Sequence, residues 1–146
     1  MSLETERLVL REFTGDDFAA VYEHRSDPEV VRYMVWEPNS DSDTLAFLDR
    51  ARTQAAADPR VAYTLGVIEK DSGQLVGGID LGRNGPDGHQ GALGYCFAKS
   101  AWGRGIATES ARRYFASASR NWTFTGSGPA ATRRTLVLFE CSRNSV

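Results

Sequence analysis

The chain has few of the residues that bind metal ions or cross-link small proteins. Its 146 residues include only two cysteines and two histidines. Cys96 and Cys141 lie in different kinds of sequence, without a Cys-x-x-Cys pair or the Cys/His spacing of a metal site. We therefore expect neither a disulfide framework nor a bound metal, and we predict that the two thiols are buried or incidental.

The sequence also lacks a long apolar run and an excess of one charge. No stretch approaches the roughly 20 apolar residues of a membrane-spanning helix, and the first ten residues, MSLETERLVL, lack the apolar centre of a signal peptide. The 17 basic and 19 acidic residues nearly balance, whereas a protein that binds mainly to phosphates carries a basic excess. These absences predict a cytoplasmic protein with no membrane partner and no nucleic-acid partner.

The length and composition fit one folded unit. With 41% hydrophobic residues, a chain of 146 residues can bury one ordinary core but is short for two. We find no internal repeat and no linker that would divide it. We therefore predict a single domain over residues 1–146.

The first part of the chain predicts one strand followed by helices. Residues 7–13 alternate in polarity, with Leu8 and Leu10 on the side expected to be buried. A helix is expected after Thr14, and Pro28 opens a second, short one. The polar residues after Pro38 cap a long helix over about residues 43–57, whose apolar side is Leu45, Phe47, Leu48 and Ala51.

The middle of the chain changes to the periodicity of strands. Three runs, at 61–70, 74–82 and 91–98, are joined by links short enough for an antiparallel meander. A helix is predicted from about 105 to 119, and its sheet-facing residues are Ile106, Ala107, Ser110, Ala111, Tyr114 and Phe115.

The stretch AKSAWGRGIATES, residues 98–110, places glycines directly before that last helix. The first amides of a helix lack intrahelical acceptors, and the helix dipole adds partial positive charge there, so such a turn favours an anion. Gly103 and Gly105 would let a phosphate approach the backbone, with Arg104 as a nearby charge. A purely structural turn is the alternative. A Walker loop is excluded because its lysine is missing, and the dinucleotide pattern fails at Thr108.

Four segments in order carry a family resemblance: LETERLVLREFTGDD, SDPEVVRYM, GQLVGGIDLG and ALGYCFAKSAWGRGIATES. Together they resemble the GCN5-related N-acetyltransferase (GNAT) superfamily, in the branch that acetylates ribosomal-protein N-termini and related amines. The resemblance covers about residues 3–119. It implies an α/β fold with a mixed, mainly antiparallel sheet flanked by helices.

The resemblance also implies a site for acetyl-coenzyme A (acetyl-CoA). In the family, a Gln/Arg-x-x-Gly-x-Gly/Ala loop binds the pyrophosphate of this co-substrate. Gly105 and Ala107 occupy the last two places of that loop here, while Trp102 stands where Gln or Arg is commoner. The expected cofactor-binding residues are Phe97, Ala98, Trp102, Gly103, Arg104, Gly105, Ile106, Ala107 and Thr108.

The implied reaction is direct attack of a primary amine, from a small molecule or a peptide, on the thioester. Such a site needs a proton acceptor and a donor for the developing oxyanion. Asp80 is a candidate base, with a solvated strand carboxylate as the alternative, and Tyr95 is either a hydrogen-bond donor or a core residue. Trp36 and Glu37 are candidates for the acceptor pocket or belong to a surface loop, and His89 is either a titrating group or a loop histidine.

The family pattern stops near residue 120, where its following strand and helix are missing or replaced. In a shifted reading frame, each new codon joins the last base of one codon to the first two bases of the next. Across Asn121, Trp122 and Thr123 this frame must encode Leu and then Asp. Permitted codons extend this to ELDVHRVWAxCDPQNARSIRVLEKLG, which resembles the missing segment. We therefore predict that the atypical tail, residues 120–146, is the out-of-frame product of a one-base deletion.

The tail leaves the activity and assembly of this chain open. TLVLFE, residues 135–140, has enough branched residues to replace the missing strand by propensity alone. Without such repair, an exposed sheet edge favours a homo-oligomer. The expected activity is therefore an impaired acetyltransferase, and the alternatives are a non-catalytic coenzyme A-binding or vestigial protein and a plain interaction module.

Overall fold

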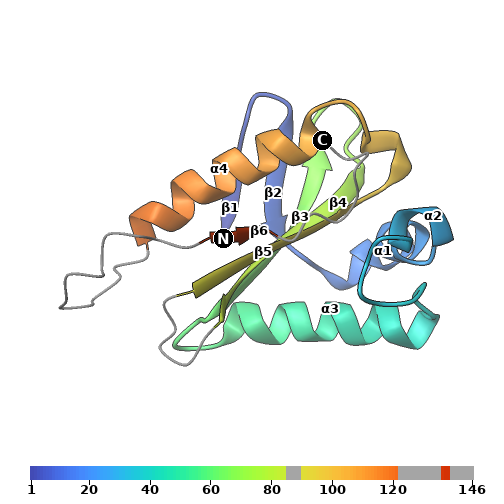
Figure 1. Ribbon diagram of the computed structural model, residues 1–146, viewed down its shortest axis with the longest axis horizontal. Helices are drawn as coiled ribbons and strands as arrows, with labels where there is room; N and C mark the ends of the chain where they lie inside the picture. Colours follow the sequence, from blue (N-terminus) through green and yellow to red (C-terminus); the bar gives the residue numbers. More distant parts are fainter. Residues whose placement is uncertain (85–89, 122–135, 139–146) are drawn as a thin grey trace.

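A computed structural model describes residues 1–84, 90–121 and 136–138 of the chain (Figure 1). Its centre is a six-stranded sheet in which the strands follow one another in sequence order. The strands are β1 (Ser2–Glu4), β2 (Leu8–Glu12), β3 (Ala62–Glu69), β4 (Leu75–Asn84), β5 (Gln90–Phe97) and β6 (Leu136–Leu138). Each pair from β1 to β5 is antiparallel, which confirms the predicted meander, and β6 is parallel to β5.

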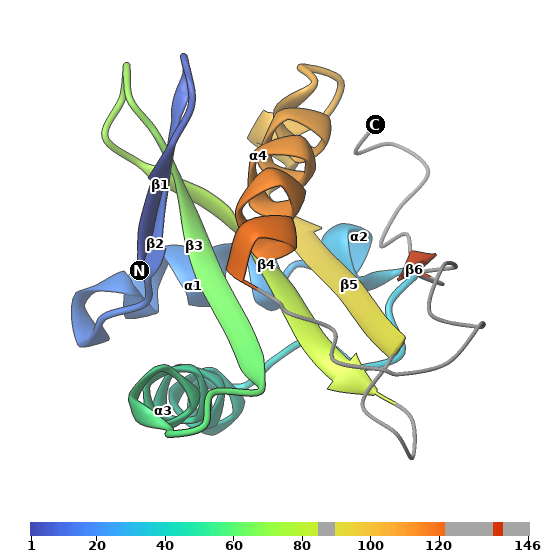
Figure 2. The same cartoon turned by 90° about the vertical axis from the view of Figure 1, so that its left-hand side faces the viewer.

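Helices cover both faces of this sheet. The α-helices are α1 (Phe18–Arg25), α2 (Pro28–Val31), α3 (Asp41–Ala56) and α4 (Ile106–Asn121), and two short 3-10 turns, η1 (Gly15–Asp17) and η2 (Lys99–Ala101), precede α1 and α4. Figures 1 and 2 show α4 over one face, with α1, α2 and α3 on the other. The predicted α/β class, with helices flanking a mainly antiparallel sheet, is confirmed.

The first strand, β1, was not predicted. It has three residues, of which only Leu3 is buried, and it pairs with β2 between Ser2 and Arg11. A single apolar residue gives no alternation to detect, so this edge strand exists through its pairing with β2.

The long helix α3 begins two residues before the predicted start. The Ser40 hydroxyl accepts from the Asp43 amide at 3.2 Å, and the Asp43 carboxylate accepts from the Ser40 amide at 2.9 Å. This capping box has Ser40 as the N-cap and fixes the start of the helix at Asp41. Leu48 and Ala51 are buried as predicted, but Leu45 is 58% exposed, so its assignment to the apolar side was wrong. The polar residue before it, Thr44, is buried in its place.

The face of α4 that packs on the sheet is the predicted one. Ile106 and Tyr114 are fully buried, next to Leu8 and Leu10 of β2. Ser110 is also fully buried, and its hydroxyl is satisfied there because it donates to the carbonyl of Ile106 at 2.8 Å. This cluster fixes α4 on the sheet, and so fixes where the helix begins.

The tail contributes β6 to the sheet. Residues 136–138 pair with residues 91–93 of β5, so part of TLVLFE forms a strand as its propensity suggested. The rest of residues 122–146, with Cys141, lies outside the described part of the chain. In the described residues, no helix combines the length and apolarity needed to cross a membrane. A homo-oligomer and a cytoplasmic location stay predictions.

Candidate functional site

The turn before α4 exposes a series of backbone donors. Gly103 and Gly105 have positive φ angles of 70° and 74°, a conformation that other residues rarely adopt. The Trp102 amide donates to Lys99 at 3.1 Å, and the Glu109 amide donates to Gly105 at 3.0 Å. Between these two bonds, the six amides of residues 103–108 have no acceptor within the described part of the chain. Consecutive amides at a helix start favour an anion.

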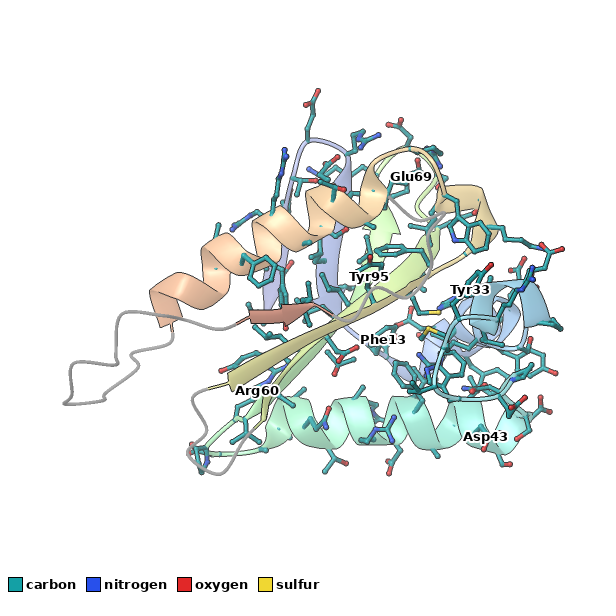
Figure 3. The ribbon with its side chains drawn as sticks, in the orientation of Figure 1. Phe13, Tyr33, Asp43, Arg60, Glu69 and Tyr95 are labelled. Carbon is teal, nitrogen blue, oxygen red and sulfur yellow. The ribbon has the colours of Figure 1, made fainter. Side chains whose placement is uncertain are left out.

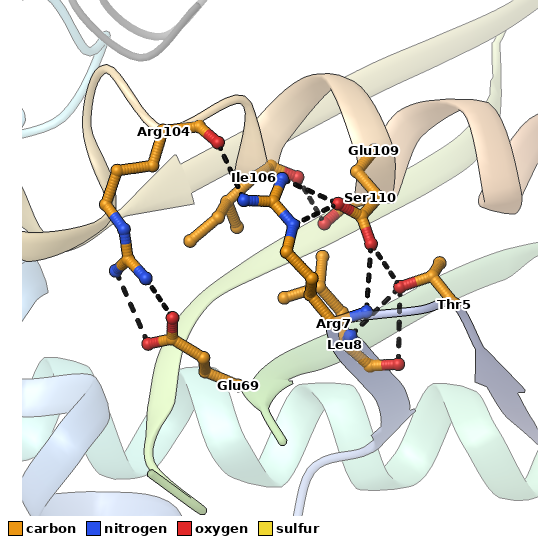
Figure 4. Close-up of polar contacts among 8 residues, drawn as sticks. All are labelled: Thr5, Arg7, Leu8, Glu69, Arg104, Ile106, Glu109 and Ser110. Carbon is orange, nitrogen blue, oxygen red and sulfur yellow. Dashed lines mark hydrogen bonds and ion pairs between the residues drawn. The ribbon is translucent and has the colours of Figure 1, made fainter. Parts of the chain in front are cut away.

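Ion pairs fasten this turn to the sheet (Figure 4). Arg104 does not extend freely, because its guanidinium pairs with Glu69 of β3 and donates to the Ser100 carbonyl at 3.2 Å. Arg7 donates to the Arg104 carbonyl at 3.0 Å and pairs with Glu109 at 2.6 Å. The turn is therefore held in shape before any ligand arrives, which reduces the entropy lost on binding.

The side of β5 that faces away from β4 lies next to the turn. The Ala98 amide donates to Val76 of β4 at 2.9 Å, and antiparallel pairing alternates, so the backbone groups of Tyr95 and Phe97 face away from β4. In the part of the chain that the structure describes, β6 pairs with residues 91–93 of β5. The Trp102 indole donates to the Phe97 carbonyl at 3.0 Å, which joins the turn to the end of this strand. An extended ligand could add to β5 here as a further strand.

A pocket of about 800 Å³ opens on the other face of the sheet, and residues of α1, α3, β3, β4 and β5 line it. Asp80, Trp36 and Tyr95 are among the lining residues, and the structure places Asp80 and Trp36 at the same pocket. Tyr95 pairs with Ile79, so its side chain starts on the opposite face of the sheet from Asp80 and packs beside Phe97. Glu37 is exposed and does not line the pocket. Figure 3 shows Phe13, another lining residue, between the sheet and α3. The volume is in the usual range for a small-ligand site.

Asp80 lies on β4 opposite Gly94 of β5. A Cβ atom on Gly94 would lie 2.8 Å from Oδ1 of Asp80, so the absence of that side chain makes room for the carboxylate. Solvent reaches Asp80 through the pocket, but the protein atoms around it disfavour its charge. This burial raises the pKa of Asp80, and the charges of Arg25 and Arg50 only partly oppose the shift. A raised pKa makes this carboxylate a better proton acceptor than an ordinary aspartate.

His24 also lines the pocket, but it is buried and held by the backbone. Its Nδ1 lies 2.7 Å from the Ala20 carbonyl, so the neutral ring donates from this atom. Burial lowers the pKa of His24 to about 4, against the opposing effect of the Ala20 carbonyl. The ring is therefore neutral at physiological pH, and His24 is poorly suited to exchange protons there.

We expect the buried His24 to make the fold sensitive to mild acid. As the pH falls, the unfolded chain gains a proton on this residue near pH 6.5, whereas the folded chain does so only near pH 4. The free energy of unfolding should fall by about 2 to 3 kcal/mol between pH 7.5 and 4.5. Urea unfolding at both pH values measures the loss. His24→Gln should remove most of it, and an equal loss in that variant would contradict the assignment.

Some pocket residues could not be found from the sequence. Arg25 and Arg50 also line the pocket, but each lies on a helix where an arginine is ordinary, so no pattern marks them. His89, a candidate from the sequence, lies outside the described residues. Among the described residues, no group of three or more His, Cys, Asp or Glu side chains could hold a metal ion.

Comparisons with known proteins agree with this arrangement. Residues 7–130 match the family model of the acetyltransferase (GNAT) domain. The "Uncharacterized N-acetyltransferase YnaD" of Bacillus subtilis (strain 168) is 30% identical over 112 residues, which are 77% of this chain and 62% of that protein. The chain thus spans less than two thirds of this relative.

Solved structures share the fold. A GNAT-family acetyltransferase from Bacillus anthracis is 25% identical, with a TM-score of 0.70 over 83% of this chain and 68% of that one. A ribosomal L7/L12 alpha-N-protein acetyltransferase, solved in complex with coenzyme A, is 15% identical, with a TM-score of 0.66 over 83% of this chain and 69% of that one. The matched domain extends from β2 through the glycine turn and α4, and the chain therefore belongs to the GNAT acetyltransferase domain family.

Proposed function

We propose that this protein transfers the acetyl group of acetyl-CoA to a primary amine. The observation that carries the proposal is the run of six amides at the start of α4, which lies beside the side of β5 that faces away from β4. This arrangement offers donors to a diphosphate and a backbone edge to an extended chain. The family assignment supports the same chemistry.

The residues around the turn fit the co-substrate predicted from the sequence. Added Cβ atoms at Gly103 and Gly105 would meet at most the Arg7 guanidinium, at 3.7 Å from Gly105, so the backbone is open to a phosphate. In our proposal, the amides of residues 103–108 hold the pyrophosphate, and β5 near Phe97 and Ala98 holds the pantetheine arm. Trp102 supports this site because its indole donates to the Phe97 carbonyl and holds the turn against the end of β5. Acetyl-CoA, when bound, supplies an acetyl group already activated as a thioester.

The pocket on the other face would receive the amine. Asp80 takes a proton from the ammonium group, directly or through water, so that the nitrogen lone pair can attack the acetyl carbon. The bond from that carbon to sulfur then breaks, and the sulfur leaves as the thiol with a second proton from the nitrogen. Tyr95, whose side chain lies on the α4 face of the neighbouring strand, would donate to the oxyanion from that face, and Trp36 would line the acceptor. By its resemblance to the ribosomal-protein branch, we include a protein N-terminus among the acceptors, along with small amines.

Two measurements test the proposal in sequence. Coenzyme A at a hundred times its dissociation constant should stabilise the fold by about 2.7 kcal/mol. Release of free thiol from acetyl-CoA in the presence of a panel of amines then reports turnover. Binding without turnover would support the non-catalytic alternative, and no binding would leave the glycine turn a structural feature.

Filling the space at Gly94 should slow the reaction. In Gly94→Ala the new methyl group must displace the Asp80 carboxylate, whose atoms lie 2.8 to 3.2 Å from its position. We expect kcat to fall by about 10- to 100-fold, because small misplacements of a catalytic group have effects of this size. Gly15→Ala is the control, because Gly15 does not line the pocket and a Cβ there meets no described atom within 4 Å. Equal kcat values for the two variants would show that the placement of Asp80 is not limiting.

We propose further that the atypical tail reflects a shifted reading frame. The support is the Leu-Asp pair that the shifted frame forces across Asn121, Trp122 and Thr123, and the resemblance of the shifted string to the missing family segment, although the family match continues to residue 130. DNA sequencing across codons 117–124 tests this proposal. The shifted frame should encode the Leu-Asp pair and continue without a stop, and restoring it should raise turnover. Codons that do not permit that reading would refute it.

A further inference from the structure

The acceptor pocket has more positive than negative charge among its described lining residues. Arg25 of α1 and Arg50 of α3 contribute two guanidinium groups, while Asp80 is the one acidic residue in that lining. His24 adds no charge near neutral pH, since burial lowers its pKa to about 4. A site meant only for a cationic amine would be expected to carry the opposite balance.

Arg25 occupies an unusual position in this pocket. Its guanidinium carbon lies 4.1 Å from the ring centroid of Trp36 and 4.1 Å from that of Phe47. Its Nε atom is buried and has no hydrogen-bond partner in the described part of the chain. In the same part of the chain, no carboxylate forms a salt bridge with this guanidinium, although the charge of Asp80 acts on it.

This geometry limits what Arg25 can bind. Two aromatic rings lie against the guanidinium, and its N–H groups point outward in its plane, so hydrogen bonds form at its edge. The edge of a guanidinium matches the two oxygens of a carboxylate or phosphate. Leaving a buried donor without a partner destabilises the fold, and positions that retain such a group are often functional. A ligand with an oxyanion would satisfy Arg25.

We propose that the acceptor is a primary amine that also carries a carboxylate or phosphate group, with the oxyanion on Arg25 and the amine facing Asp80. Arg50, which is exposed at the pocket, adds attraction for the oxyanion. The inference rests on the proposed function, because it names the substrate class of the same site. It explains why one pocket holds both a lone carboxylate and a stacked guanidinium.

Matched pairs of amines test the proposal through turnover. The pairs are 4-aminobutanoate with butylamine and phosphoethanolamine with ethanolamine, so that the two arms separate carboxylate from phosphate. We expect kcat/KM to be about 10- to 100-fold higher for the anionic member of at least one pair, which is the usual strength of hydrogen bonds to a charged group. A preference for the neutral member in both pairs would overturn the proposal.

Variants then assign the preference to one residue. Arg25→Met keeps an unbranched side chain between the two rings but removes the charge. It should abolish the preference mainly by raising KM for the anionic amines. Arg25→Lys should restore part of the preference. Arg52→Met is the control, because Arg52 is exposed on α3 and does not line the pocket. A preference that survives in Arg25→Met would refute the role of Arg25.

Calorimetric binding of the same amines, with saturating coenzyme A and without it, separates this inference from the proposed function. Anionic amines that bind through Arg25 without turnover would support the inference and contradict the function. Turnover that favours neutral amines would support the function and contradict the inference. If neither 4-aminobutanoate nor phosphoethanolamine binds, the inference fails whatever the turnover shows.

Discussion

Asp80→Asn is expected to lower kcat for acetyl transfer by about 100- to 10,000-fold, the usual contribution of a positioned general base. The amide is close in size to the carboxylate, so the contact with Gly94 and the wall of the pocket should persist. What the variant loses is the group that accepts the proton of the ammonium. Single-turnover kinetics with saturating acetyl-CoA and amine measures the effect on the chemical step.

The pH profile distinguishes this role from a structural one. Burial raises the pKa of Asp80, so kcat for the wild type should rise with pH through a value above 3.8, and this limb should disappear in the variant. The folded state is penalised when this carboxyl ionises, because its pKa is higher than in the unfolded chain. At neutral pH the variant should therefore be at least as stable as the wild type.

Asp49→Asn provides the control for Asp80→Asn. Asp49 is exposed on α3 and does not line the pocket, so its change from a carboxylate to an amide leaves the site intact. We expect wild-type kcat for this variant. Near-wild-type kcat in Asp80→Asn would show that another group or bulk water removes the proton.

Gly105→Ala should weaken coenzyme A binding by about 10- to 100-fold, which corresponds to the loss of about one hydrogen bond to a charged group. The φ angle of Gly105 is 74°, where an alanine is strained by about 1 to 2 kcal/mol. Relief of this strain turns the amides of the loop away from the position that a diphosphate requires. Isothermal titration with coenzyme A measures the dissociation constant.

Gly73→Ala separates the effect of strain from the effect on binding. Gly73 lies in the turn between β3 and β4, has a φ angle of 69°, and would have no atom within 4 Å of an added Cβ. Both variants should therefore lose a similar amount of unfolding free energy. Only Gly105→Ala should bind coenzyme A more weakly, and equal affinities in the two variants would argue against the turn as the diphosphate site.

The site has two parts, the glycine turn before α4 and the pocket around Asp80, and the sequence predicted the first more fully than the second. The glycine turn is local, since Gly103, Gly105 and the start of α4 adjoin in the chain, and a pattern of a few residues predicts its backbone. The sequence also named Asp80, because alternation on β4 places it opposite Ile79 and Leu81. It gave no reason to prefer the base over a solvated carboxylate, because that choice depends on α3 and on Gly94 of the neighbouring strand.

By itself, the sequence determined the order of the strands and helices, the sheet-facing side of α4 and the turn before it, because periodicity and glycine placement act over a few residues. Only the tertiary structure decided what surrounds Arg25. Trp36 and Phe47, 11 and 22 residues further along the chain, both lie against its guanidinium because α1 and α3 pack on the same face of the sheet. Burial and stacking arise from such distant contacts, and these give an ordinary helix arginine its candidate role in binding.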